Sequence, residues 1–306
     1  MSRHFITIED LSDSDLASIY TLATSPFDDT TLSGQGVALV FERPSLRTRA
    51  SSSSAVHELG GYTTFFNDEE IGLDSRESAE DVARTIAEMY AIAALRVRNH
   101  EVFHRMRAAT SERLSLVNLL SNEAHPTQAV ADVLTIADEF ANGDVTKLSG
   151  LDVAYVGDAT NVTRSLAVAL LRLGVNVTVG APEAYQLVKA ASEDPSRVPG
   201  PGTLRQVDDA RDAVKNADVV YTDAWVSMGL ENETARRRVD LAQFQVNDAL
   251  MSLAKPEAIL LHCLPAHRGD EISNEVLDGA QSRVWRQVFH RRSSMMGVLR
   301  WIKGEV

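Results

Sequence analysis

The stretch LSLVNLLSNEAHPTQAVADVLTIADEFANGDVTKLSGLDVAYVG (residues 114–157) decides the fold. It begins with LSLVNLL (114–120), a short apolar run typical of a buried strand, and continues into a helix that starts near Pro126. The apolar side chains of this helix share one face, at Val130, Val133, Leu134 and Ala137. The turn-rich segment 141–150 then precedes a second strand, LDVAYVG (151–157). This order predicts an α/β fold with a domain boundary at the turn.

The same alternation extends in both directions along the chain. Further strands are predicted at VALVF (37–41), AIAALRV (91–97), VNVTV (175–179), DVVYT (218–222) and AILLHC (258–263). Helices are predicted after residue 41 up to Gly60, from the capping pattern at Ser78 to about Tyr90, around 166–173, and from about Trp285 to Lys303. Strands that alternate with helices indicate parallel sheets, so we expect two doubly wound α/β domains.

Composition excludes several classes of protein. The chain has 306 residues, which suggests two domains, and its formal charge is −13, which argues against nucleic acid or an anionic membrane as the main partner. Its single cysteine, Cys263, rules out an internal disulfide framework and a Cys-rich metal site. The N-terminus has no apolar core of signal-peptide length and no run is long enough to span a membrane, so we expect a cytoplasmic protein.

Ligands of doubly wound folds bind beyond the carboxyl ends of strands, and basic residues follow two strands of the first domain. FERPSLRTR (41–49) places Ser45, Arg47, Thr48 and Arg49 in a strand-to-helix turn. Backbone N–H groups and arginines at such a turn favour a phosphate site, although a solvated basic turn is the alternative. Arg96 ends the next strand and is either a second anion ligand or a surface residue.

Two further strand ends carry polar side chains. In NEAHPTQ (122–128), His125 and Gln128 stand at a helix N-terminus, where they can reach a carbonyl oxygen or simply cap the helix. VGDATN (156–161) resembles a nucleotide-binding turn only loosely, because Asp158, Ala159 and Asn161 occupy its later positions and the G-x-G-x-x-G pattern is absent.

The last two strand ends combine a carboxylate and a thiol. TDAWVSMG (222–229) offers Asp223 for a substrate ammonium group and a loop with Ser227, Met228 and the hinge candidate Gly229, or else an ordinary capping Asp. HCLPAHRG (262–269) gathers His262, Cys263, His267 and Arg268. A nucleophilic thiolate and a buried small hydrophobe both fit Cys263, and we predict no metal site because no ligand spacing is defined.

Taken in order, these segments resemble the carbamoyltransferase family, most closely its ornithine branch, over essentially the whole chain. SLRTR (45–49) is similar to the S-T-R-T-R motif, and HPTQ (125–128) matches without change. DAWVSMG (223–229) and HCLPAHRG (262–269) resemble the amino-acid loop and the Cys-containing signature of that branch.

The resemblance implies a carbamoyl-phosphate domain over 1–140, completed by the C-terminal helix (about 286–306) packing back on it, and an amino-acid domain over 150–285. It assigns Arg96, His125 and Cys263 to catalysis. Carbamoyl phosphate would be bound by Ser45, Leu46, Arg47, Thr48, Arg96, His125, Gln128, Cys263, Leu264 and Arg291, and ornithine by Asn161, Asp223, Ser227 and Met228. It further implies citrulline formation in arginine biosynthesis without a metal or other cofactor, and a homotrimer or an assembly of trimers.

Four departures from the family pattern keep other readings open. Leu46 replaces a threonine, Gly72 stands where a glutamine that reaches a neighbouring subunit is expected, the loop near 160 is one residue short, and Phe289-His290 replaces Glu-Asn before Arg291. The alternatives are a sibling enzyme acting on another diamino acid or a diamine, and a catalytically impaired paralogue. A nucleotide-dependent oxidoreductase shares the fold class but requires the missing glycine pattern.

Overall fold

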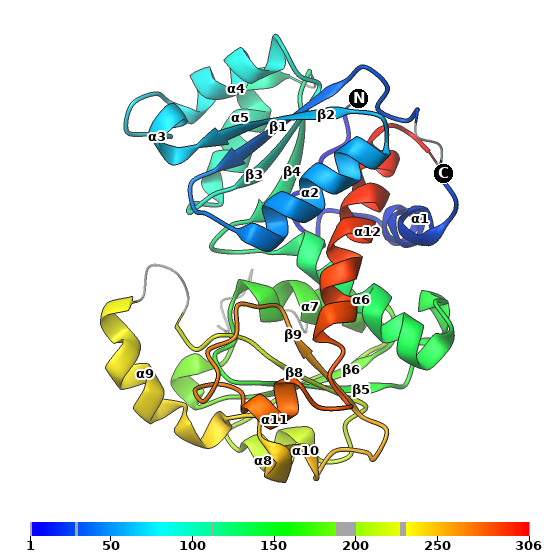
Figure 1. Ribbon diagram of the computed structural model, residues 1–306, viewed down its shortest axis with the longest axis vertical. Helices are drawn as coiled ribbons and strands as arrows, with labels where there is room; N and C mark the ends of the chain where they lie inside the picture. The colour runs from blue at the N-terminus through cyan, green and yellow to red at the C-terminus, as the bar shows by residue number, and fades with distance from the viewer. Residues whose placement is uncertain (1, 28–29, 112, 188–199, 227–230, 306) are drawn as a thin grey trace. The chain divides into compact units, whose positions relative to one another are not determined.

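The computed structural model describes residues 2–27, 30–111, 113–187, 200–226 and 231–305. The chain divides into two compact units (Figure 1). Unit 1 comprises residues 1–131 and 289–306, and unit 2 comprises residues 132–288. Each unit contains one parallel sheet with helices, which confirms the predicted fold class. The predicted boundary at the 141–150 turn stays a prediction.

Unit 1 contains a four-stranded parallel sheet in the order β2-β1-β3-β4. The strands are β1 (Gly36–Phe41), β2 (Tyr62–Asn67), β3 (Ile92–Arg96) and β4 (Ser115–Leu120). β1, β3 and β4 are buried along nearly their whole length, as their apolar sequences predict. β2 was not predicted, because this edge strand is only partly buried and its sequence, YTTFFN, lacks a continuous apolar run.

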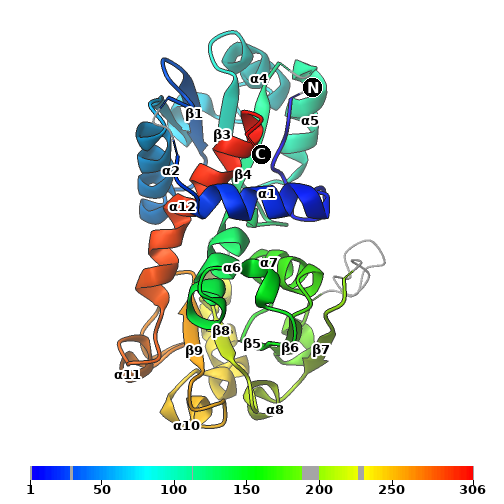
Figure 2. The ribbon, with the colours of Figure 1, turned by 90° about the vertical axis from the view of Figure 1, so that its right-hand side faces the viewer.

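Helices cover both faces of this sheet. α2 (Leu46–Glu58) lies on one side, and α4 (Ala79–Ala87) and α5 (Glu101–Thr110) on the other (Figure 2). On the α4/α5 side, apolar residues of these helices, including Val82, Ile86, Phe103 and Met106, form one buried cluster with strand residues such as Val40 and Leu95. The short helix α3 (Asp68–Ile71) follows β2, and α1 (Asp13–Thr24) precedes β1.

Unit 2 contains a five-stranded parallel sheet in the order β7-β6-β5-β8-β9. Its strands are β5 (Asp152–Val156), β6 (Asn176–Gly180), β7 (Leu204–Val207), β8 (Val219–Thr222) and β9 (Ile259–His262). The apolar runs predicted β5, β6, β8 and β9. They missed β7, a four-residue edge strand of sequence LRQV with no fully buried position.

The helices of unit 2 also lie on both faces of its sheet. Figure 1 shows α7 (Asn161–Arg172) on one side and α8 (Ala210–Val214) with α10 (Asp248–Met251) on the other. In the described part of this unit the chain also forms α9 (Thr234–Asp240) and α11 (Asn274–Leu277). Single 3₁₀ turns lie at Val145–Lys147, Glu183–Tyr185, Glu231–Glu233 and Ala242–Phe244.

Two long helices contain the points where the chain passes from one unit to the other. These helices are α6 (Pro126–Ala141) and α12 (Val284–Ile302). The C-terminal part of α12 packs on α1 within unit 1, where Trp301 Nε1 donates to Asp15 Oδ1 at 3.0 Å. A Cβ atom at Gly297 would collide with the carbonyl oxygen of Ile19, so α12 and α1 approach each other at backbone distance. None of the described helices combines the length and apolar character that a membrane crossing requires.

Each sheet has one point where the strand order reverses, and ligands of open α/β sheets bind beyond the carboxyl ends of the strands there. In unit 1 this point lies between β1 and β3, whose ends pair at Phe41 and Arg96. In unit 2 it lies between β5 and β8, whose ends pair at Val156 and Thr222. These two edges position the candidate sites.

Candidate active site

The turn after β1 presents the N-terminus of α2. Ser45 caps this helix: its hydroxyl accepts from the Thr48 backbone N–H at 3.4 Å and donates to Thr48 Oγ1 at 3.0 Å. A helix N-terminus attracts anions through its N–H groups and its dipole. Arg47 is half-buried beside it, whereas the Leu46 side chain is 80% exposed, so only the backbone of Leu46 is available to a ligand bound in the turn.

Three buried polar side chains lie at or after the ends of two neighbouring strands of the same sheet. Arg96 ends β3, and His125 and Gln128 lie at the start of α6, directly after β4. Their exposed fractions are 6%, 5% and 1%. Arg96 is therefore not a surface residue, which leaves the anion-ligand interpretation of the two that the sequence allowed.

Arg291 of α12 joins these elements within unit 1. Its guanidinium donates to Thr48 Oγ1 at 3.2 Å, to His125 Nε2 at 3.2 Å and to Gln128 Oε1. One cation thus contacts residues that follow two different strands of the sheet. Burial, together with the positive charges of Arg291 and Arg96, holds the pKa of His125 well below its usual value of 6.5.

The protonation state of His125 follows from these contacts. An imidazole with a strongly lowered pKa is neutral at pH 7. A guanidinium can only donate, so Nε2 of His125 accepts from Arg291 and the single ring proton lies on Nδ1. His125 therefore offers an uncharged N–H donor beside two arginines.

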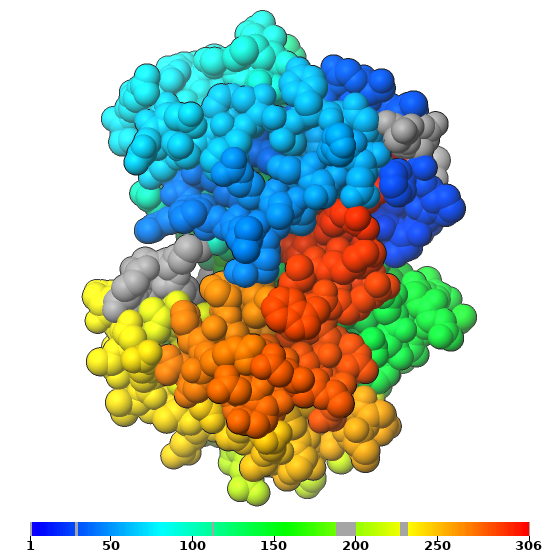
Figure 3. Space-filling model, in the orientation of Figure 1, coloured from blue at the N-terminus to red at the C-terminus, as the bar shows by residue number. Residues whose placement is uncertain are grey.

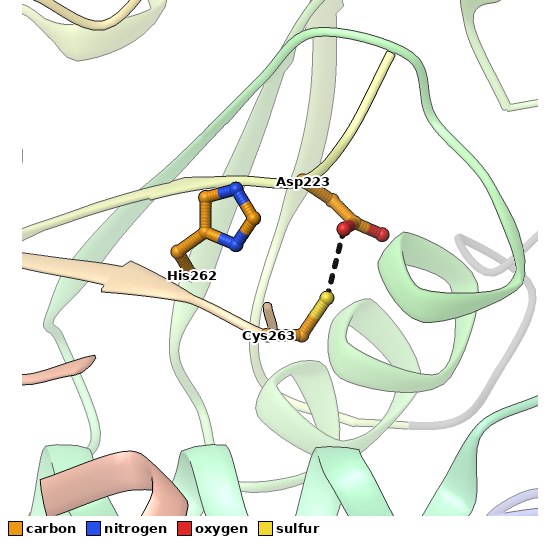
Figure 4. Close-up of side chains that lie close together, drawn as sticks. All are labelled: Asp223, His262 and Cys263. Carbon is orange, nitrogen blue, oxygen red and sulfur yellow. Dashed lines mark hydrogen bonds between the residues drawn. The ribbon is translucent and has the colours of Figure 1, made fainter. Parts of the chain in front are cut away.

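In unit 2, a carboxylate and the thiol meet beyond the ends of β8 and β9. Cys263 Sγ donates to Asp223 Oδ1 at 2.8 Å (Figure 4). The preceding residue, His262, is fully buried; its Nδ1 accepts from the Leu264 N–H at 2.8 Å, and its Nε2 lies 3.0 Å from Glu271 Oε1. The imidazole therefore fixes the backbone on the C-terminal side of Cys263.

The same residues include side chains of the types that bind metal ions. Asp223, His262 and Cys263 offer three ligand atoms within 4.8 Å of one another. The thiol, however, already donates to the carboxylate, and both ring nitrogens of His262 have protein partners. These hydrogen bonds account for the cluster without an ion, and the arrangement does not resemble a closed tetrahedral site.

The predicted site residues thus fall into two groups. Ser45, Leu46, Arg47, Thr48, Arg96, His125, Gln128 and Arg291 belong to unit 1, and Asn161, Asp223, Cys263 and Leu264 belong to unit 2. Asn161 is the first residue of α7, beside the end of β5. Ser227 and Met228 lie outside the described residues, and the predicted roles of all these side chains stay predictions.

One buried charge cluster next to the second group was not predicted from the sequence. Arg237 of α9 contacts Asp158 and Glu233 as ion pairs and the carbonyl oxygen of Trp225. A signal was available, since Glu233 and Arg237 are four residues apart and such pairs meet on one helix face. Nothing in the sequence indicated which of the arginines at 236–238 points inward.

Comparisons with known proteins match two family models to successive parts of the chain. The family model for the aspartate/ornithine carbamoyltransferase carbamoyl-P binding domain matches residues 3–138, and the model for the Asp/Orn binding domain of that family matches residues 149–302. An ornithine carbamoyltransferase of Acidothermus cellulolyticus is 41% identical over 311 residues, covering 99% of this chain and 97% of the relative.

Solved structures show the same likeness. The structure of ornithine carbamoyltransferase from Pyrococcus furiosus is similar with a TM-score of 0.90 and 33% identity, covering all of this chain and 98% of that one. The structure of an N-acetyl-L-ornithine transcarbamylase mutant aligns with a TM-score of 0.84 but 21% identity, over 98% of this chain and 99% of that one, and shares the fold. On both domain matches and the full-length likeness, the chain belongs to the aspartate/ornithine carbamoyltransferase family.

Proposed function

We propose that the protein transfers the carbamoyl group of carbamoyl phosphate to the δ-amine of L-ornithine, giving L-citrulline and phosphate. The observation that carries the proposal is the convergence of Arg291 on Thr48, His125 and Gln128, which gathers anion and carbonyl ligands around the strand ends of unit 1. Curated relatives named ornithine carbamoyltransferase support the choice of ornithine.

The phosphate end of the donor is bound at the N-terminus of α2. The N–H groups that open this helix supply uncharged donors, as does the Thr48 hydroxyl, which accepts from Ser45 and Arg291. Arg47 and Arg96 supply charged donors. Phosphate is also the leaving group, so the same contacts stabilise the negative charge that it gains when the C–O bond breaks.

The carbonyl oxygen of the carbamoyl group is the second point of stabilisation. Attack by an amine converts this carbonyl into a tetrahedral centre and places negative charge on its oxygen. Neutral His125, whose ring proton lies on Nδ1, and the Arg96 guanidinium are the proposed donors to that oxygen. Loss of one such donor costs about 3 kcal/mol of transition-state stabilisation in comparable sites.

The amino acid is bound by unit 2. Asp223 is the proposed partner of the substrate ammonium group, with Asn161, Ser227 and Met228 completing recognition of the α-amino and carboxylate groups. The Cys263 thiol, which donates to Asp223, lies beside the reacting amine. The attacking Nδ must be deprotonated, because an ammonium group has no lone pair for the carbamoyl carbon.

A panel of amines tests this proposal. Purified protein and carbamoyl phosphate are offered ornithine, lysine, 2,4-diaminobutyrate, putrescine, acetylornithine and aspartate in parallel, and ureido products are measured. Citrulline from ornithine alone supports the proposal. A different preferred amine would identify the protein as a sibling enzyme with that amine as its substrate. A folded protein that makes no product from any amine would be the impaired paralogue that the Leu46 and Gly72 departures suggest.

We further propose, from the family resemblance, a homotrimer or an assembly of trimers that serves arginine biosynthesis in the cytoplasm. The 1–140 and 150–285 domain limits belong to the same proposal. Light scattering coupled to size-exclusion chromatography measures the assembly directly, and a monomer at micromolar concentration contradicts the trimer.

A further inference from the structure

Three consecutive arginines on α9 differ sharply in their surroundings. The side chains of Arg236 and Arg238 are 70% and 56% exposed and pair with Asp240 and Asp270. The side chain of Arg237 is 10% exposed, although α9 lies at the surface of the protein (Figure 3). Burying an arginine costs solvation free energy, so a buried member of such a triplet requires an explanation.

Arg237 joins three segments at the strand-order reversal of unit 2. Its Nη1 atom contacts Asp158 Oδ2, in the loop after β5, and donates to the Trp225 carbonyl oxygen at 3.0 Å, after β8. Its Nε donates to Glu233 Oε2 at 2.9 Å, in the turn before α9. The guanidinium carbon also lies 5.3 Å from the centre of the Tyr185 ring.

These partners flank the predicted amino-acid ligands. Trp225 lies two residues after Asp223, and Asp158 lies three residues before Asn161. The contact between Arg237 and Trp225 is made to backbone, so it restrains the path of the chain beside Asp223 whichever side chain stands at 225.

The charges in this region explain why a cation is needed. Asp158 is 7% exposed, and burial raises the pKa of its carboxyl group, as do the negative charges of Asp223 and Glu233, while Arg237 lowers it. Without Arg237, a buried Asp158 carboxylate would repel Asp223 or take up a proton. Either change would alter the field that a substrate ammonium group meets at Asp223.

We propose that Arg237 is a positioning residue for the amino-acid subsite: it neutralises Asp158, holds the chain beside Asp223, and thereby sets the affinity for the amino-acid substrate. The inference rests on the proposed function and deepens it, since that function assigns no role to Arg237 or Asp158. The competing explanation is a buried ion pair that serves stability alone.

Steady-state kinetics separates the two explanations. Arg237→Ala should lower kcat/KM for ornithine by roughly 100-fold, the loss typical of a displaced binding group. Most of this loss should appear as a raised KM for ornithine, while KM for carbamoyl phosphate stays within about twofold, because the proposed ligands of its phosphate group belong to unit 1. Arg237→Lys, which keeps the charge but not the forked geometry, should recover part of the loss.

The neighbouring arginines are matched controls. Arg236→Ala and Arg238→Ala remove the same charge from the same helix but break exposed ion pairs, so both should stay within about twofold of the wild type in every constant. If kcat/KM for ornithine fell as much in the controls as in Arg237→Ala, the loss would be due to the overall charge of α9, and the positioning role would be overturned.

A charge-balanced double variant covers the case in which Arg237→Ala fails to fold. Asp158→Asn with Arg237→Ala removes both buried charges, so it should fold and bind ornithine better than Arg237→Ala. A stably folded double variant with wild-type KM for ornithine would show that the pair serves stability alone.

Wild-type turnover distinguishes failure of this inference from failure of the proposed function. A wild-type protein that forms no citrulline refutes the proposed function and removes the basis of the positioning role. Normal wild-type turnover together with an unchanged Arg237→Ala variant refutes the positioning role and leaves the proposed function standing.

Discussion

At the carboxyl edge of its sheet, unit 1 gathers the arginines Arg47, Arg96 and Arg291, whereas unit 2 gathers the carboxylates Asp158 and Asp223 at the corresponding edge of its own sheet. On each edge, these side chains gather around the point where the strand order reverses. The architecture therefore determines where a ligand binds, and the residues that follow each strand determine its charge. One edge suits an anion and the other an ammonium group.

Each unit also contains a buried arginine that stands next to a more exposed arginine on the same helix. Arg291 is 5% exposed and faces the anion site, and the adjacent Arg292 pairs with Glu58 through a half-buried side chain. Arg237 and its neighbours repeat this arrangement on α9. In unit 1 the buried arginine contacts proposed ligands directly, whereas in unit 2 it contacts carboxylates and backbone around them.

The largest effect on the contrast between the two units is expected from Arg291→Ala. We expect kcat/KM for carbamoyl phosphate to fall by roughly 100- to 1,000-fold, because the change removes a cation from the site together with the partner of His125, Gln128 and Thr48. Arg292→Ala, on the same helix, should stay within about twofold. Equal losses in the two variants would mean that α12 acts through its charge and not through Arg291.

The next largest effect is expected at the thiol of unit 2. Cys263→Ala removes the donor to Asp223, which should lower kcat by about tenfold, while the free energy of unfolding changes by about 1 kcal/mol or less because Cys263 is only partly buried. Cys263→Ser keeps a donor, so its kcat should lie between those of the wild type and Cys263→Ala. Denaturant titration of each variant checks the stability; an unfolded Cys263→Ala protein would favour a core role for this residue.

The charge of unit 1 can also be tested by pH. Because the pKa of His125 lies well below 6.5 in the folded protein, its imidazole should not titrate between pH 8 and 6, which NMR of the ring protons shows once His125→Asn identifies the signal. The unfolded chain takes up this proton near pH 6.5, so the stability that neutral His125 contributes is complete above that pH and is lost as the pH falls below it. A midpoint near 6.5 would contradict the inferred neutral donor.

The smallest expected effect concerns the departure at Leu46. Leu46→Thr restores the hydroxyl of the family motif on a side chain that is 80% exposed, so stability should not change measurably. If that hydroxyl reaches the phosphate, KM for carbamoyl phosphate should fall by roughly fivefold, the equivalent of one added hydrogen bond of about 1 kcal/mol. An unchanged KM would show that the backbone N–H suffices.

Whether a strand could be predicted from the sequence depended on how deeply that strand is buried. Strands that are buried along nearly their whole length, such as β1 and β3, were recognised from continuous apolar runs, whereas the edge strands β2 and β7 were missed because partial burial leaves no such run. The candidate site residues were likewise chosen from contiguous motifs, and their roles stay predictions. Arg237 and Asp158, separated by 79 positions, meet only in the folded chain, and no local pattern announces their contact.

The long separations within unit 1 have a consequence for how the protein folds. Arg291 stands 163 residues after Gln128 and 243 residues after Thr48, with the whole of unit 2 between Gln128 and Arg291. Contacts of such high sequence separation form late, because a large loop must close before they are made. Refolding experiments should therefore recover secondary structure first and carbamoyl-phosphate binding last, and a fragment limited to residues 1–131 should acquire its sheet without acquiring the complete anion site.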